Sequence, residues 1–217
     1  MGFLSAVLDL RYPPRCVFCR RIMRSPAERV CPDCARTLPY AGTRGERHGD
    51  FFSVCHAPLL YEGAVRESLL RYKFQETPAY AAAYGEMLAV CVRTELDGAW
   101  DLITWVPLSR QRLRERGYDQ ARLLAEETAK RLGTEALRTL EKPVNTARQS
   151  GTGSREKRAA NISGAYRVPD PALVAGKRVL LIDDIITTGA TLSECARTLR
   201  SAGAAEVLCA ALATTPD

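Results

Sequence analysis

Histidine is scarce in this chain, which has only His48 and His56 among 217 residues. This scarcity argues against a hydrolase built around a histidine base. No apolar run reaches about 18 residues, so the sequence predicts no transmembrane helix and no membrane insertion. The N-terminal run MGFLSAVLDLRYPP has no leading Lys or Arg and contains Asp9, which argues against a signal peptide. We therefore expect a cytoplasmic protein.

Two common nucleotide-binding motifs are also absent. No Gly-Lys-Ser/Thr closes a Walker A loop, and no G-x-G-x-x-G precedes a helix. The composition, 46% hydrophobic and 26% charged, is that of an ordinary globular protein. The net charge of +6 favours anionic partners such as phosphate, pyrophosphate or nucleic acid, although a solvated basic surface gives the same value.

Residues 178–192, RVLLIDDIITTGATL, form the most informative segment. An apolar run leads into Asp183 and Asp184, and apolar residues at helical spacing follow a small-residue turn. The turn consists of Thr187, Thr188, Gly189, Ala190 and Thr191. Backbone N–H groups and a helix dipole favour a phosphate there, and the carboxylates can accept from ribose hydroxyls or coordinate Mg²⁺. The alternative is a strand-to-helix turn with surface acids.

The eight cysteines divide into two groups. Four form the pattern C-x2-C-x11-C-x2-C and four are scattered: Cys16, Cys19, Cys31 and Cys34, then Cys55, Cys91, Cys195 and Cys209. Paired C-x-x-C knuckles each present two thiolates to one tetrahedral ion, so the first group predicts a structural zinc site. Disulfides and an iron–sulfur cluster are the alternatives. We interpret the scattered cysteines as small buried apolar side chains.

The chain divides into a small metal-dependent module and an α/β domain. We assign residues 1–40 to a zinc ribbon, 41–53 to a linker and 54–217 to the larger domain. The patterns predict strands at 54–61, 101–106, 136–140, 178–182 and 206–213, and helices at 63–72, 78–95, 118–132 and 190–202. This alternation predicts a mostly parallel sheet with helices on both faces and a ligand beyond the carboxyl ends of the strands.

Two polar segments interrupt this pattern. Residues 143–164 are rich in Gly, Ser, Asn, Arg and Lys, and we interpret them as a mobile lid, with plain disorder as the alternative. Four arginines at every second position, Arg110, Arg112, Arg114 and Arg116, follow the strand at 101–106. This spacing fits an extended arm with its guanidinium groups on one side, suited to bidentate phosphate contacts. The alternative is a solvated charge run.

The segment 178–192 resembles the phosphoribosyl pyrophosphate (PRPP) motif of type I phosphoribosyltransferases, and the whole chain resembles the ComF family. Members of this family join a zinc ribbon to a phosphoribosyltransferase domain. The resemblance rests on the four cysteines, Tyr72-Lys73-Phe74, Val106-Pro107-Leu108, Arg116-Gly117-Tyr118-Asp119-Gln120, the residues Gln149, Arg158 and Asn161, and the DD-x-x-TTGAT run. Asp119 stands where the family usually has Asn, so we assign it no phosphate contact.

The resemblance implies a Mg²⁺-dependent PRPP site. Asp183 and Asp184 are expected to hold the ribose hydroxyls with Mg²⁺, and residues 187–191 the 5′-phosphate. The pyrophosphate candidates are Lys73, Pro107, Leu108, Ser109, Arg110, Arg114 and Arg116, and the lid candidates are Gln149, Arg158 and Asn161. The family is linked to the handling of incoming single-stranded DNA during natural transformation. The rival interpretation is a non-catalytic PRPP- or nucleotide-binding module that engages single-stranded DNA or a helicase. The acceptor is not legible in the sequence.

Overall fold

The computed structural model describes residues 13–25, 27–75, 77–96, 98–143 and 164–216. The segment 144–163, which contains the lid candidates Gln149, Arg158 and Asn161, lies outside the described residues. None of the helices in the described part of the chain is both long and apolar enough to cross a bilayer.

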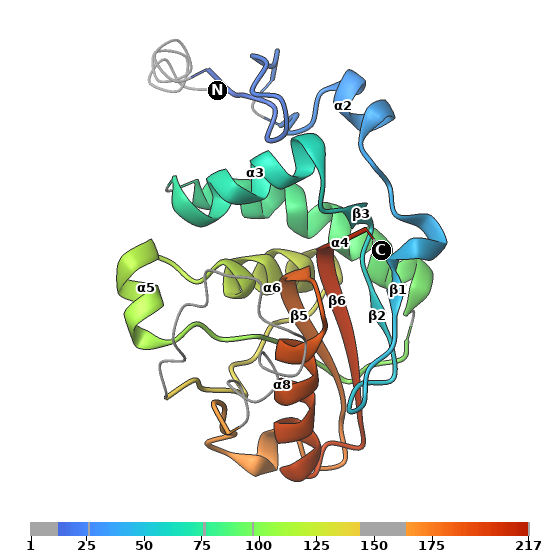
Figure 1. Cartoon of the computed structure of the whole chain (residues 1–217), viewed down its shortest axis with the longest axis vertical. Helices are drawn as coiled ribbons and strands as arrows, with labels where there is room; N and C mark the ends of the chain where they lie inside the picture. Colours follow the sequence, from blue (N-terminus) through green and yellow to red (C-terminus); the bar gives the residue numbers. More distant parts are fainter. Residues whose placement is uncertain (1–12, 26, 76, 97, 144–163, 217) are drawn as a thin grey trace.

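A mostly parallel sheet forms the centre of the larger domain (Figure 1). Its strands are β1 (Glu46–Arg47), β2 (Cys55–His56), β3 (Leu59–Leu60), β4 (Leu102–Trp105), β5 (Arg178–Ile186) and β6 (Glu206–Thr214). The order is β1-β2-β6-β5-β4, with β3 also paired to β6, and only the β1–β2 pair is antiparallel. The central strands β5 and β6 are mostly buried because both of their faces are covered.

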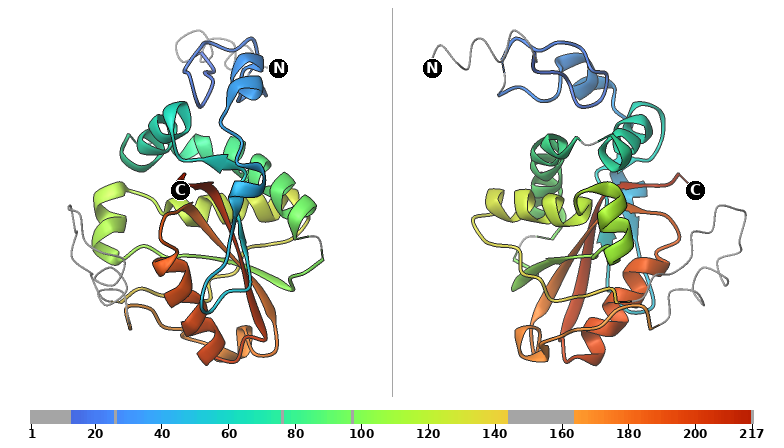
Figure 2. Two further views of the ribbon diagram at one scale, coloured as in Figure 1. Left: turned by 45° about the vertical axis from the view of Figure 1, so that its right-hand side comes forward. Right: turned by 90° about the vertical axis from the view of Figure 1, so that its left-hand side faces the viewer.

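Helices cover both faces of this sheet, as the sequence predicts (Figure 2). The α-helices of the described residues are α2 (Pro32–Thr37), α3 (Gly63–Phe74), α4 (Ala81–Glu95), α5 (Arg110–Arg116), α6 (Gln120–Arg131) and α8 (Ala190–Ser201). Of these, α4, α6 and α8 contact the central strands, whereas α2 lies in the N-terminal ribbon, away from the sheet. Leu180 and Ile182 of β5 pack in one core with side chains of α3, α4 and α6, whereas Leu181 packs in a second core with α8. The alternation of side chains along β5 therefore separates the two cores.

Three of the expected strands differ from the observed ones. The run 54–61 is divided into β2 and β3 around Pro58, which has no N–H to donate to a neighbouring strand. The segment 136–140 forms only an isolated bridge, between Ala136 and Ile103. Strand β5 does not end before the acids, because its pairing with β6 continues through Asp183 to Ile186. The segment assigned to a linker contributes β1 to the sheet.

The prediction of an extended arginine arm is wrong, because residues 110–116 form helix α5. The side chain of Ser109 caps its start by accepting from Arg112 N at 3.4 Å. Gly117 ends the helix in the left-handed region, at φ +76°, with its N–H donated to the Leu113 carbonyl. Residues two apart lie on opposite sides of a helix, so Arg112 and Arg116 are half-buried whereas Arg110 and Arg114 are exposed.

The zinc ribbon contacts the larger domain through its first C-x-x-C knuckle, which lies beside α3 in both views (Figure 2). Arg71 of α3 donates to the carbonyl oxygens of Val17 at 3.0 Å and Phe18 at 2.6 Å. Ser68 Oγ also donates to the Val17 carbonyl and lies 2.5 Å from the hydroxyl of Tyr84. The backbone of the knuckle is therefore fixed by side chains of the larger domain.

The role of Arg71 in this contact can be tested by removing its side chain. Arg71→Ala leaves two carbonyl groups without their charged donor, so we expect the free energy of unfolding to fall by about 2 kcal/mol. Urea unfolding followed by circular dichroism measures the change, and the exposed Arg66 on the same helix provides the control, Arg66→Ala. Equal losses for the two variants would contradict a specific contact.

Candidate functional site

A cavity of about 360 Å³ lies where β5 approaches its carboxyl end. Its lining includes residues of α3, the turn after β4, helix α5, the start of α6, the end of β5 and the turn between β5 and α8, together with residues on both sides of 144–163. Parallel strands place their carboxyl ends at one edge of a sheet, which is where α/β proteins bind ligands. The structure thus brings together segments that are more than 100 residues apart in the sequence.

Two carboxylates and a lysine meet in this cavity. Lys73 Nζ lies 2.9 Å from Asp184 Oδ1, and the two side chains are only 18% and 11% exposed. Burial, together with the charge of Asp184, raises the pKa of Asp183 to about 8. Asp183 Oδ1 also accepts from the Asp184 N–H at 2.8 Å. Two adjacent acids are therefore held with one opposing cation, and the carboxylate oxygens form a donor set of the kind that Mg²⁺ accepts.

The turn between β5 and α8 borders the same cavity, with Thr187 and Thr191 in its lining. Gly189 adopts φ +75° immediately before α8, which only glycine does at little cost. It gives no side-chain cap to this 12-residue helix. Thr188 Oγ1 lies 3.5 Å from Ala190 N, so the hydroxyls and N–H groups of residues 187–191 are concentrated at the helix N-terminus. This arrangement is favourable for an anion.

Asp119 holds the turn after β4 instead of facing a ligand. Its carboxylate accepts from Leu108 N at 3.1 Å and from Arg122 N at 3.2 Å, and so it joins the turn to the start of α6. It is not among the residues that line the cavity. The turn residues that do line the cavity include Pro107 and Ser109.

The lining separates the predicted pyrophosphate residues into two groups. Those that line the cavity are Lys73, Pro107, Leu108, Ser109 and Arg116, and those that do not are Arg110 and Arg114. Arg112, which we left out of the candidates, lines it together with Arg116. Arg116 donates to Gln120 Oε1 at 2.8 Å and lies over the Phe74 ring. A prediction of helix after Ser109 would have placed Arg112 and Arg116, which are four residues apart, on the same face.

No motif in the sequence points to Lys142 and Tyr166, which lie on the two sides of the segment 144–163 and both line the cavity. Lys142 Nζ donates to the Tyr166 hydroxyl at 3.1 Å and lies 4.7 Å from the centre of its ring. Burial and the nearby charge of Arg112 lower the pKa of Lys142. Two backbone hydrogen bonds between Glu141 and Arg167, of 2.9 and 3.0 Å, bring these side chains together.

The four N-terminal cysteines form one cluster, in which all the sulfur atoms lie within 4.8 Å of one another. Cys19 Sγ and Cys31 Sγ are 3.6 Å apart. A tetrahedral zinc ion with Zn–S bonds of about 2.3 Å separates its sulfur ligands by about 3.8 Å, so the cluster fits this ion. Backbone N–H groups point at the sulfurs, with Cys31 N 3.4 Å from Cys16 Sγ. The scattered cysteines are buried, as expected.

Two family models match parts of the chain. A family model described as "Double zinc ribbon domain" matches residues 7–60, and one described as "Phosphoribosyl transferase domain" matches residues 119–217. The chain therefore combines a zinc ribbon, whose cysteine cluster supports a structural zinc ion, with a domain of the phosphoribosyltransferase fold.

Two relatives align with most of the chain, and a third aligns with about half of it. Competence protein F of Haemophilus influenzae is 28% identical over 215 residues, which cover 89% of this chain and 93% of the relative. Competence protein ComFC of Streptococcus pneumoniae is 28% identical over 217 residues, covering 94% and 90%. DNA utilization protein YhgH of Escherichia coli K12 is 33% identical over 108 residues, covering 49% and 46%. These relatives and the two domain matches confirm the resemblance to the ComF family.

The zinc site leads to a test by elemental analysis. We expect one zinc ion per chain, and its removal by a chelator should unfold the ribbon, because structural zinc contributes on the order of 10 kcal/mol to such modules. Cys34→Ser should lower the zinc content, whereas Cys91→Ser, which changes a buried cysteine outside the cluster, should leave it at one. Purified protein that contains no zinc would exclude the site.

Proposed function

We propose that this chain is a Mg²⁺-dependent, PRPP-binding protein of the phosphoribosyltransferase type, acting in the cytoplasm and linked to natural competence. The observation that carries the proposal is the meeting of the Lys73–Asp184 pair with the N-terminus of α8 in one cavity. A sugar with a phosphate on one side and a diphosphate on the other needs such a site, with acids between two anion-binding regions.

Each part of PRPP has a counterpart in the cavity under this proposal. Residues 187–191 receive the 5′-phosphate, because hydroxyls and N–H groups are concentrated there. Asp183 and Asp184 accept from the ribose hydroxyls. When bound, Mg²⁺ supplies positive charge that neutralises the diphosphate. Lys73 offsets the negative charge of the two acids and can also contact the diphosphate.

The diphosphate is assigned to the side of the cavity formed by the turn after β4 and by α5. Arg116 keeps this role and Arg112 replaces Arg110 and Arg114, because of these four arginines Arg112 and Arg116 line the cavity. In the transfer reaction the bond from ribose C1 to the diphosphate oxygen breaks and a bond from C1 to the acceptor forms. Cations that surround the departing diphosphate stabilise its developing charge, and Lys142 adds a further one.

The rival function is a non-catalytic module that binds PRPP or a nucleotide and also contacts single-stranded DNA or a helicase. One observation favours it: Arg110 and Arg114 are exposed and lie outside the cavity, where they can reach a polyanion. Release of diphosphate in the presence of candidate acceptors separates an enzyme from such a module.

Removing the charge of the two acids tests the ribose site. The double variant Asp183→Asn/Asp184→Asn keeps the shape but cannot carry the negative charge that bound Mg²⁺ would favour on both carboxyl groups, so it loses charge-assisted hydrogen bonds worth roughly 1.5–3 kcal/mol each. PRPP binding should therefore weaken by a factor on the order of 100, measured by calorimetric titration with Mg²⁺. Asp50→Asn, at an exposed aspartate outside the cavity, is the matched control. An unchanged dissociation constant in the folded double variant would refute the assignment.

Helix α5 provides a matched pair of arginines for a second test. Arg112→Ala should weaken PRPP binding about tenfold or more, whereas Arg110→Ala should leave it unchanged, because only Arg112 lines the cavity. Single-stranded DNA binding is measured on the same proteins against salt. If the exposed arginines serve DNA, losing Arg110 should lower the salt dependence by about one unit. PRPP binding that depends on Arg110 and not on Arg112 would contradict the arrangement.

A further inference from the structure

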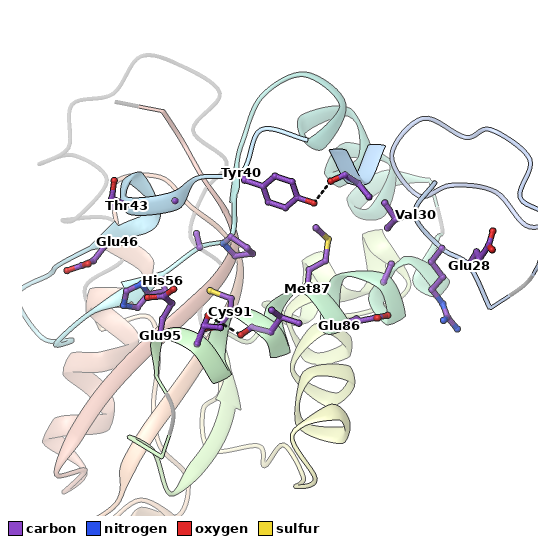
Figure 3. A pocket seen from close by; sticks show the side chains of 18 of the residues that line it. Glu28, Val30, Tyr40, Thr43, Glu46, His56, Glu86, Met87, Cys91 and Glu95 are labelled. Carbon is purple, nitrogen blue, oxygen red and sulfur yellow. Dashed lines mark hydrogen bonds between the residues drawn. The ribbon is translucent and has the colours of Figure 1, made fainter. Parts of the chain in front are cut away.

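A second and larger cavity, of about 860 Å³, forms a groove between the zinc ribbon and α4 (Figure 3). One wall is α4, and the other includes ribbon residues 27–30, the segment that leads from α2 to β1, and residues 56–58 at the end of β2. It shares no lining residue with the cavity assigned to PRPP. The groove is therefore a separate feature that the phosphoribosyl site does not use.

The α4 wall is one continuous helix face. Its residues recur at intervals of three and four: Ala83, Glu86, Met87, Val90, Cys91, Thr94 and Glu95. This spacing places them in one stripe that runs about 18 Å along the helix. The opposite side of α4 packs on α6, where a Cβ on Gly85 would lie 2.6 Å from Glu127 Cβ. One face of α4 is thus packed and the other opens into the groove.

The middle of the groove is apolar and partly exposed to solvent. Val90 is 54% exposed on α4, and Tyr40 is 48% exposed on the other wall. Tyr40 donates its hydroxyl to the Ala35 carbonyl at 2.8 Å, which fixes the ring where Figure 3 shows it, across from Met87. Methionine adapts to side chains of different shapes. A rigid aromatic residue facing adaptable apolar side chains is suited to an apolar anchor.

Both ends of the groove are acidic. Figure 3 shows Glu28 and Glu86 toward one end and Glu46 and Glu95 toward the other. Glu46 pairs with His48, whereas Glu28, Glu86 and Glu95 form no ion pair with another of the described residues. Arg29 is the one Lys or Arg in the lining, although the chain as a whole carries +6. The groove therefore has the opposite sign to the rest of the molecule.

We propose that this groove docks a basic amphipathic segment of a partner protein, with an apolar middle and Lys or Arg at both ends. Helix-in-groove recognition places apolar side chains at helical spacing into such a channel. A stripe of about 18 Å matches a helix of about 12 residues. The glutamates select against nucleic acid, whose phosphates they repel. Because the two cavities share no lining residue, a docked segment leaves the phosphoribosyl site open.

Fluorescence anisotropy with three synthetic peptides tests the proposal on the full-length, zinc-loaded chain. The first is a 12-residue amphipathic helix with leucines at helical spacing and lysines at both ends. The second has glutamates in place of the lysines, and the third has serines in place of the leucines. We expect the first peptide to bind at least about tenfold more tightly than either of the others, and to weaken as salt is added.

Substitutions of charged and apolar residues of the groove then test whether the peptide binds there. Glu86→Lys/Glu95→Lys and Val90→Asp should each weaken the first peptide by about tenfold. These residues are exposed, so the variants are expected to fold. Glu135→Lys and Leu173→Asp, at exposed positions outside the groove, are the matched controls and should leave binding unchanged. A photo-reactive leucine at the centre of the peptide should crosslink to α4 or to the wall that carries Tyr40.

Several outcomes would overturn the proposal. These are equal binding of the three peptides, loss of binding in the control variants as large as in the groove variants, and crosslinks to the phosphoribosyl cavity. Oligomers of the chain that dissociate in Val90→Asp would also overturn it, because the groove would then be an interface between copies. Competition by a single-stranded oligonucleotide for the crosslinked position would instead assign the groove to nucleic acid. PRPP binding is measured in a separate experiment, so a chain that fails to bind PRPP can still bind the peptide and the peptide test keeps its meaning.

Discussion

The carbonyl groups of Val17 and Phe18 converge on the guanidinium of Arg71, and the placement of the zinc ribbon depends on this contact. The two carbonyls lie inside the first C-x-x-C knuckle, where the backbone is held by the metal ligands on either side. Arg71 stands two residues before Lys73 on α3. The helix that receives the knuckle therefore also supplies the cation that pairs with Asp184, so the zinc ribbon and the cavity proposed to bind PRPP depend on one element.

Contacts between tyrosine side chains hold α3, which both binds the knuckle and carries Lys73, against α4 and α6. Tyr72 is fully buried, donates its hydroxyl to the Gln120 carbonyl at 2.9 Å and meets the Tyr84 ring edge-on at 5.2 Å. Its own carbonyl accepts from the Tyr118 hydroxyl. These contacts join α3 to α4 and α6, and burial holds the pKa of Tyr72 far above its ordinary value, so the hydroxyl remains a donor at any physiological pH. The position of Lys73 is thus set by the residue beside it.

Patterns with strong local chemistry could be predicted from the sequence, and those set by tertiary contacts could not. The cysteine spacing, the alternation of strands and helices, and the turn at residues 187–191 each follow from short-range rules. Arginines at every second position are compatible with a strand and with a short helix. The residue that favours the helix is the N-cap Ser109, and a single serine in a polar run is a weak signal. Lys142 enters the cavity only because Glu141 pairs with Arg167, a contact that no periodicity predicts.

Charge is divided between two faces of one small protein. Lys73, Arg112, Arg116 and Lys142 converge on the cavity proposed to bind PRPP, whereas glutamates border the groove beneath the ribbon. Ligands of opposite sign can then approach without competing for a surface. Helix α4 lies between the two sites, because its stripe forms the groove wall while Tyr84, from another face, touches Tyr72. These contacts couple ligand binding at the cavity to binding at the groove only if α3 or α4 has two conformations and both ligands shift the equilibrium between them. Two routes of contact join α4 to the cavity: α4 packs on α6, whose Gln120 and Ala121 line the cavity, and its Tyr84 touches Tyr72, the neighbour of Lys73 on α3.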